Sequence, residues 1–497
     1  MSSLTQFFLS AFSTFLPAQK YLGVLFTLVC ALPTVAHSES SNQLPAIGDA
    51  SSGIIAQQLE KELGDAWLKS LRRQVKTIDD PLINAYFSDL VYQLVPNSAL
   101  QNTQLTLVIV DSPELNAFAV PGGIIGINAG LFLYAKSEQE FASVIAHEIA
   151  HLSQRHYARN VEYMQKTAPL QLAGLLASVV VAATAGSDAG MAALAGTQAL
   201  GAQEQLSYSR QNEQEADREG LKTLFNTGME TRSMPDMFER MLQNNRYSAN
   251  QLPEYLSTHP LTASRVADTK NRAEQYPKGQ YIDNPEFYLM QARVLTHYSR
   301  AIDSLVTAYR SHLSDSQDKP ALQDQYGLAI ALIEQDQQKE AIGILNDLLK
   351  QNGLRTTFLA TKAAAMAKSG EVEAAITLLE QALTVSPYNF SLRLLTGKLQ
   401  TQAGKIKEAE ANLLAASKLK PEEPSVWYEL AEVHGLARNI VALHQARAEY
   451  YFLMGRYKDA ISQLELAQTK NQGAYPASTV IEQRLQEFNE QRKANRF

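Results

Sequence analysis

The alternation of apolar and polar residues predicts a helix that begins near residue 138. Its apolar side, with the spacing of 3.6 residues per turn, consists of Phe141, Val144, Ile145, Ile149 and Leu152. The sequence Ser-Glu-Gln-Glu at 137–140 has the spacing of a capping box, which satisfies the first free backbone N–H groups of a helix. No proline follows until Pro169, so the helix can continue past residue 151.

Short runs rich in β-branched residues precede this helix and predict a small sheet. They span residues 105–110, 117–120 and 124–127, and Pro-Gly-Gly at 121–123 separates the last two. A strand with a free edge can pair with an extended peptide, so Phe118, Ala119 and Val120 are candidate substrate-binding residues. A sheet that only supports the helix is the simpler alternative, and both interpretations fit the pattern.

A 34-residue repeat occupies the C-terminal part of the chain. Alanine recurs at this period, five residues after a turn position, in the pairs Asp336 and Ala341, Gly370 and Ala375, and Gly404 and Ala409. Small residues at this period are typical of the helix-turn-helix units of tetratricopeptide repeats. The pairing returns at Gly455 and Ala460, 51 residues on, which leaves room for one additional helix around residues 426–438. An all-α tetratricopeptide-repeat solenoid is therefore predicted.

The first 36 residues have the layout of a secretory signal peptide. Lys20 precedes an apolar run over residues 21–32, and Thr-Val-Ala at 34–36 offers a small-residue cleavage site. The alternative is a retained N-terminal membrane anchor, for which the apolar run is short. Cleavage leaves a chain without cysteine, because Cys30 is the only one. We therefore expect a periplasmic protein that uses neither thiol chemistry nor disulfides.

A second apolar segment, residues 170–206, is rich in Ala, Leu, Val and Gly. Its most apolar part, residues 170–185, is shorter than the ~20 residues that span a bilayer. A buried helical hairpin is the first interpretation. The alternative is a mobile flap or a segment that makes peripheral membrane contact.

Length and composition indicate a globular protein of several domains. The 497 residues, of which 45% are apolar and 19% charged, suffice for two or three domains. The net charge is −7, and the sequence has neither a basic stripe nor a phosphate-binding loop. Nucleic acid is therefore not expected as a partner.

His147, Glu148 and His151 form a His-Glu-x-x-His motif on the predicted helix. Residues four apart share a helix face, so both imidazoles can hold one zinc ion while Glu148 acts as general base toward a zinc-activated water. A chance match with solvated or structural histidines is the alternative, but it leaves the carboxylate cluster at 212–217 unexplained. A catalytic zinc site needs only one more ligand from the protein, because one position stays open for water.

The third ligand is expected from that carboxylate cluster. Glu213 and Asp217 are four residues apart and share a helix face, whereas Glu215 points about 200° away from Glu213. We assign Glu213 to the zinc ion, one per chain, and Asp217 to a hydrogen bond with a ligand histidine. A charged surface helix is the alternative explanation of the cluster.

His259 and Arg265 are candidate catalytic residues that stabilise the developing oxyanion. His259 has two alternative roles, as a fourth zinc ligand that holds the enzyme latent or as a structural histidine. His156 is excluded as a ligand, because in one continuous helix it lies nine residues after His147 and faces the opposite side.

Several motifs occur in the order found in one family of metallopeptidases. They are Asn-Ala-Phe-Ala-Val-Pro-Gly-Gly at 116–123, the motif at 147–151, Ser-Arg-Gln-Asn-Glu at 209–213 with Ala216 and Asp217, and His-Pro at 259–260 with Arg265. The chain thereby resembles the gluzincin metallopeptidases that include HtpX and the prenyl-protein peptidases. The resemblance implies an α+β zincin-like domain, mostly helical with a small sheet. It also implies zinc on the residues that match His147, His151 and Glu213.

With its leader and its repeats, the chain is most similar to the periplasmic members of this family that act in outer-membrane protein assembly. This resemblance implies a protease that degrades unfolded or misassembled outer-membrane proteins and assists their assembly. It also implies that the repeats dock on the assembly machinery. The predicted organisation is a signal peptide at 1–36, a zinc metallopeptidase domain at 37–276, a linker at 277–285 and a repeat domain at 286–497.

Two other functions compete with this one. A non-proteolytic chaperone or assembly scaffold with a latent metal site is the first, but a scaffold needs no general base and Glu148 is intact. A membrane-embedded relative of HtpX is the second. It requires several spanning helices, and the apolar segments of this chain are too short to supply them.

Overall fold

The computed structural model describes residues 57–160, 202–247, 254–315 and 321–494. The predicted signal peptide at 1–36 lies outside these residues. So does the apolar segment at 170–206, except for its last five residues, which belong to helix α9 (Ala202–Asn226). Among the described helices, none is both long and apolar enough to cross a membrane.

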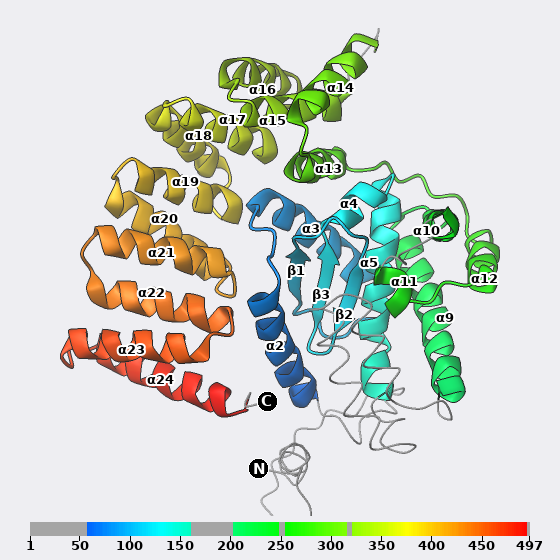
Figure 1. The fold of residues 1–497 in the computed structure, drawn as a ribbon, viewed down its shortest axis with the longest axis horizontal. Helices are drawn as coiled ribbons and strands as arrows, with labels where there is room; N and C mark the ends of the chain where they lie inside the picture. Colours follow the sequence, from blue (N-terminus) through cyan, green and yellow to red (C-terminus); the bar gives the residue numbers. More distant parts are fainter. Residues whose placement is uncertain (1–56, 161–201, 248–253, 316–320, 495–497) are drawn as a thin grey trace, which may run out of the picture. The chain divides into compact units, whose positions relative to one another are not determined.

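A three-stranded sheet forms the centre of the N-terminal half (Figure 1). Its strands are β1 (Thr106–Val110), β2 (Ala117–Val120) and β3 (Ile124–Asn128), in the spatial order β1-β3-β2. β3 pairs in parallel with β1 and antiparallel with β2, which places β2 at an edge. The β2–β3 turn contains Gly122 and Gly123, whose φ angles of 84° and 81° favour glycine. The predicted small sheet is therefore confirmed.

Helices surround the sheet and account for most of this half. They are α2 (Gln57–Gln74), α3 (Pro81–Leu94), the 3-10 turn η1 (Val95–Asn97), α4 (Gly130–Tyr134), α5 (Glu138–Ser153), α9, α10 (Ser233–Tyr247), α11 (Glu254–Thr258) and α12 (Ala263–Ala273). At the start of α5, Ser137 Oγ accepts a hydrogen bond from the Glu140 backbone N–H at 3.2 Å. The Glu140 carboxylate accepts from the N–H of Lys136 at 2.6 Å, one residue earlier than in a standard capping box. α5 packs on β2 and α9.

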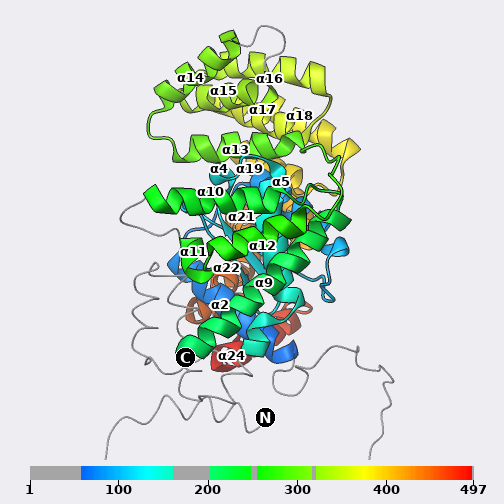
Figure 2. The ribbon, with the colours of Figure 1, turned by 90° about the vertical axis from the view of Figure 1, so that its right-hand side faces the viewer.

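The C-terminal half is a succession of antiparallel helices. They are α13 (Pro285–Tyr298), α14 (Ile302–Asp315), α15 (Leu322–Glu334), α16 (Gln338–Asn352), α17 (Thr356–Lys368), α18 (Val372–Val385), α19 (Phe390–Gln402), α20 (Ile406–Leu419), α21 (Pro424–Leu436), α22 (Ile440–Leu453), α23 (Tyr457–Asn471) and α24 (Ala477–Ala494). Figure 2 shows them from a second side. The predicted solenoid is confirmed, and the additional helix predicted at 426–438 is α21.

The repeat pattern reflects tight turns followed by close helix packing. The predicted turn residues Asp336, Gly370, Gly404 and Gly455 all have positive φ, and the alanines five residues later, at 341, 375, 409 and 460, are fully buried. A fifth turn of this kind, at Arg438 with φ of 57°, was not predicted. It lies 34 residues after Gly404 and therefore continues the same period.

One apolar core runs from the helices around the sheet into the first repeats. Phe287 of α13 lies 5.7 Å from the ring of Phe141 and 6.2 Å from that of Phe132. The buried Glu138 carboxylate accepts hydrogen bonds from Tyr281 at 2.9 Å and from the backbone of Asn284 at 2.6 Å. The domain boundaries drawn from the sequence stay a prediction. The segment assigned to a linker is hydrogen-bonded to the start of α5.

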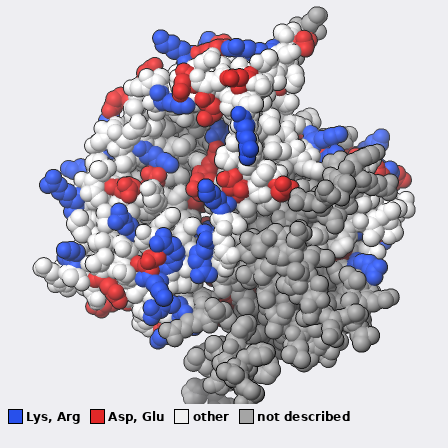
Figure 3. Space-filling model, in the orientation of Figure 1, with Lys and Arg blue, Asp and Glu red and all other residues white. Residues whose placement is uncertain are grey.

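Charged side chains of both signs are interspersed over the described surface that Figure 3 shows. Several of them pair between successive repeat helices, such as Arg310 with Glu340 and Lys398 with Glu429. These pairs are largely exposed, and exposed pairs contribute little to stability.

Candidate metal centre

Four side chains from three separate segments converge beside the sheet. His147 and His151 lie on α5, Glu213 lies on α9, and His259 directly follows α11. One ligand atom from each lies within 4.8 Å of the other three. His147, Glu213 and His259 are buried, so this group of three imidazoles and a carboxylate is largely removed from water.

The spacing of these atoms suits a single small cation. His147 Nε2 lies 3.0 Å from His151 Nε2 and 3.4 Å from Glu213 Oε2, and His151 Nε2 lies 3.4 Å from Glu213 Oε1. Ligands about 2.0–2.1 Å from a tetrahedral zinc ion lie roughly 3.3–3.4 Å from one another. Nitrogen and carboxylate oxygen are also the donor types that zinc accepts. The predicted ligand residues are therefore brought together in an arrangement that fits zinc.

His259 completes this group. Its Nδ1 lies 3.1 Å from Glu213 Oε1 and 3.4 Å from His147 Nε2, and its Nε2 lies 3.5 Å from Glu148 Oε1. Tyr255 packs against the imidazole, with the ring centroids 4.8 Å apart. The structure thus places His259 where either a fourth ligand or an oxyanion donor would have to stand.

Glu148 is fully buried beside the converging ligands. Neither of its carboxylate oxygens has a hydrogen-bond partner among the described residues, and burial raises the pKa of this carboxyl. A buried carboxylate without a partner is costly unless something outside the chain satisfies it. These are the properties expected of a general base that waits for a substrate water.

Asp217 and Arg265 lie behind the ligands, as an ion pair. Arg265 donates from Nε to Asp217 Oδ2 at 2.6 Å and from Nη2 to Asp217 Oδ1 at 2.7 Å. Its Nη1 lies 2.7 Å from Glu213 Oε2. Asp217 Oδ1 in turn lies 3.0 Å from His147 Nδ1, although the contact is too bent for a regular hydrogen bond. Arg265 therefore holds both carboxylates of α9 toward α5.

These contacts set the ionisation of the buried groups. Burial alone would raise the pKa of Asp217 and of Glu213, but neighbouring positive groups outweigh it and lower both values. Burial alone would lower the pKa of His147, but the neighbouring carboxylates of Asp217 and Glu213 raise it to about 9. Both carboxylates are therefore ionised at neutral pH.

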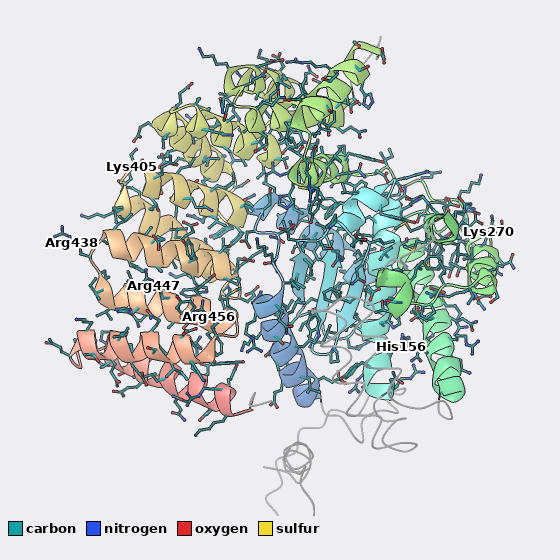
Figure 4. The ribbon with its side chains drawn as sticks, in the orientation of Figure 1. His156, Lys270, Lys405, Arg438, Arg447 and Arg456 are labelled. Atoms are coloured by element: carbon teal, nitrogen blue, oxygen red, sulfur yellow. The ribbon has the colours of Figure 1, made fainter. Side chains whose placement is uncertain are left out.

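The position of His156 differs from the sequence prediction. α5 ends at Ser153, and Arg155 adopts a left-handed conformation with φ of 49°. The chain therefore turns back instead of continuing as one helix, and His156 Nδ1 lies 2.9 Å from His151 Nδ1. His156 does not face away from the centre, as the ideal helix predicted, although it is not one of the four converging residues. Burial lowers the pKa of His156 to about 4. Figure 4 marks its position beside α5.

The candidate substrate strand lies at the sheet edge next to α5. Among the described residues, β2 pairs only with β3, so its other edge is open. The Phe118 ring packs over Gly126 and lies 5.2 Å from the ring of Trp67. Val120 is buried, and Phe118 and Ala119 are partly exposed. The strand can thus offer its backbone, while the Phe118 side chain is already engaged in packing.

Tyr255 is a residue of this centre that the sequence did not single out. It is buried, and its hydroxyl has no hydrogen-bond partner among the described residues. Its only sequence signal is its position four residues before His259, which is one helical turn.

Comparison with known proteins agrees with this geometry. Residues 81–273 match peptidase family M48, and residues 366–433 match a tetratricopeptide repeat. The β-barrel assembly-enhancing protease of Escherichia coli (strain K12) is 34% identical over 453 residues, which are 90% of this chain and 92% of the relative. The mitochondrial metalloendopeptidase OMA1 of Saccharomyces cerevisiae is 28% identical over 53% of this chain and 76% of its own length.

A solved tetratricopeptide-repeat protein of Thermus thermophilus is 20% identical over 41% of this chain and 98% of its own, with a TM-score of 0.25. The motifs of the metal centre all fall inside or at the edges of the M48 match. The chain is therefore a metallopeptidase of family M48 with C-terminal tetratricopeptide repeats, and it belongs to the family of the β-barrel assembly-enhancing proteases.

Proposed function

We propose that this protein is a zinc-dependent endopeptidase in which His147, His151 and Glu213 hold one zinc ion per chain. The observation that carries the proposal is the partnerless carboxylate of Glu148, buried beside converging ligand atoms. A bound zinc ion supplies a Lewis acid and lowers the pKa of water at this place.

Glu148 performs the proton transfers of the reaction. As general base it takes a proton from the attacking water, and as general acid it delivers that proton to the leaving amine. Its burial suits both tasks, because a raised pKa makes the carboxylate a stronger base. Asp217 and Arg265 orient the ligands: Arg265 fixes the Glu213 carboxylate, and Asp217 lies against the ring of His147.

The substrate binds as an extended chain along β2. The open edge of this strand, with Phe118, Ala119 and Val120, presents backbone N–H and C=O groups beside α5. Pairing with the edge carries a peptide past Glu148 without recognition of its side chains. Such binding suits unfolded substrates of varied sequence.

His259 has two proposed roles that exclude each other in time. When its imidazole stands as a fourth ligand, no position is open and the enzyme is latent. When it moves aside, it can donate to the developing oxyanion. Arg265 is the other oxyanion candidate from the sequence, but its contacts with Asp217 and Glu213 favour a positioning role.

In the cell, the protein acts in the periplasm on misassembled or unfolded outer-membrane proteins, which it degrades, and it assists outer-membrane protein assembly. The repeats dock on substrate or on the assembly machinery, and residues 170–206 are a candidate for peripheral membrane contact. The 34% identity with a β-barrel assembly-enhancing protease over 90% of the chain supports this placement.

A non-proteolytic assembly scaffold is the second candidate. The observation in its favour is that His259 already occupies the remaining side of the ligand group, 3.1 Å from Glu213 Oε1. A permanently closed site of this kind would be structural.

Zinc content and casein cleavage by the full chain distinguish the two. We expect about one zinc per chain and cleavage that Glu148→Gln lowers by at least ~10²-fold without loss of zinc. A gain of activity in His259→Ala would support latency. A wild type with no zinc and no activity would overturn the peptidase proposal, and a zinc-loaded but inactive wild type and His259→Ala would favour the scaffold.

A further inference from the structure

The break after α5 brings a second histidine against the far side of His151. His151 directs Nε2 toward the other ligands, 3.0 Å from His147 Nε2, and directs Nδ1 toward His156 Nδ1 at 2.9 Å. His156 Nε2 lies 3.2 Å from Glu215 Oε2, which also accepts from Arg159 Nη1 at 2.9 Å. Four side chains thus form one continuous line that ends at a predicted metal ligand.

Proton counting fixes the direction of every hydrogen bond in this line. A His151 that binds a cation through Nε2 carries its proton on Nδ1, so Nδ1 is the donor in the contact with His156. His156 Nδ1 must then be an acceptor, which leaves the proton of His156 on Nε2. That proton points at the Glu215 carboxylate, an obligatory acceptor when ionised. No other tautomer of His156 satisfies both contacts.

The backbone conformation after α5 makes this contact possible. Continuation of α5 would carry His156 to another side of the helix, and the left-handed Arg155 redirects the chain. A non-glycine residue in this conformation carries a conformational cost. The Arg155 guanidinium is held from α2, where Glu60 Oε1 accepts from Nη2 at 2.7 Å and from Nε at 3.3 Å.

The two histidines of α5 therefore have parallel support. Behind His147 stand Asp217 and then Arg265. Behind His151 stand His156, Glu215 and then Arg159. Glu215, which points away from Glu213 along α9, reaches the centre by this second route.

We propose that His156 is a positioning residue that fixes the tautomer and the ring orientation of His151, with Glu215 fixing His156 in turn. The inference rests on the proposed zinc site. Partners of this kind orient metal-bound imidazoles and raise their basicity, and their loss typically lowers metal affinity about 10- to 100-fold.

Zinc affinity of the full chain, measured by competition with a chromogenic chelator, tests the proposal. His156→Leu keeps the volume and removes the acceptor, so zinc should bind about 10- to 100-fold more weakly. His156→Asn places an amide oxygen near the position of Nδ1, and most of the affinity should return. His434→Leu removes a buried histidine of the repeats and should leave the affinity unchanged. Thermal unfolding of the metal-free variants shows whether each one folds.

Unchanged affinity in His156→Leu would overturn the proposal, and so would a folded His156→Asn that binds zinc as weakly as His156→Leu, because packing would then be the whole role. A wild type that binds no zinc would overturn the proposed function itself. The two failures are therefore distinguishable.

Discussion

The metal centre and the repeat solenoid are stabilised by opposite means. The centre buries several charged side chains, such as Glu213, Asp217 and Arg265, and pairs them across 48 residues of sequence. The repeats bury alanine and leucine between successive helices, at intervals of about one repeat. Pairing buried charges demands every partner at once, because a single loss leaves an uncompensated charge. Apolar packing between neighbours loses only the contacts of the changed residue.

This difference explains why the two halves suit different tasks. A charged, desolvated centre holds its groups in defined ionisation states, which proton transfer and metal binding require. A solenoid built from local contacts can present a long surface.

Removal of the buried arginine should have the largest effect on this contrast. Arg265→Met leaves Asp217 and Glu213 buried without their cation, so we expect a loss of about 3–5 kcal/mol in the free energy of unfolding. The matched control is Arg310→Met in the repeats, whose pair with Glu340 is about half exposed. That variant should lose less than about 1 kcal/mol. Equal losses in urea unfolding would show that the buried ion pair has no special weight.

A smaller effect is expected from overpacking in the repeats. A Cβ added at Gly397 would lie 2.6 Å from Leu413 Cγ, so Gly397→Ala should cost about 1–3 kcal/mol. Gly343 also lies in a repeat helix, but nothing stands within 4 Å of an added Cβ. Gly343→Ala should therefore stabilise by about 0.4–1 kcal/mol through helix propensity and the unfolded state. Thermal unfolding of both variants measures this, and a tolerated Gly397→Ala would contradict the close packing of α19 and α20.

The smallest effect concerns a lysine shared by the two halves. Lys69 of α2 donates to Gln491 Oε1 at 2.6 Å and lies 3.9 Å from the centroid of the Phe452 ring. Burial lowers the pKa of Lys69 from 10.5 to about 8. Between these values the unfolded chain binds more protons than the folded one, so stability rises with pH. From about pH 7.5 to about pH 9 we expect a gain of about 1 kcal/mol.

The comparison with Lys69→Met isolates this contribution, since the other titrating groups are common to both proteins. The difference in stability between wild type and variant should change with pH in this window. A constant difference would show that Lys69 keeps an ordinary pKa.

The repeats could be predicted from sequence because their determinants are local. Each turn lies five residues before a buried alanine, and the 34-residue period repeats the pair. Arg438 escaped prediction, since arginine lacks the sequence signature of a left-handed turn. Its conformation follows from the helices on either side.

The metal centre could be predicted only in part. Shared helix faces correctly brought His147 next to His151 and placed Glu213 and Asp217 on one side of α9. The roles of these residues stay predictions. The turn at Arg155, which redirects His156, depends on a partner in α2, and no local pattern announces it. The bidentate grip of Arg265 likewise depends on how α12 docks against α9.

Anomalous diffraction at the zinc edge, from crystals of the full chain, tests the central claim most directly. The account predicts one zinc peak per chain, bonded to His147 Nε2, His151 Nε2 and the Glu213 carboxylate, with His259 either as fourth ligand or displaced. A chain without a zinc peak, or a peak that Glu213 does not contact, would contradict it.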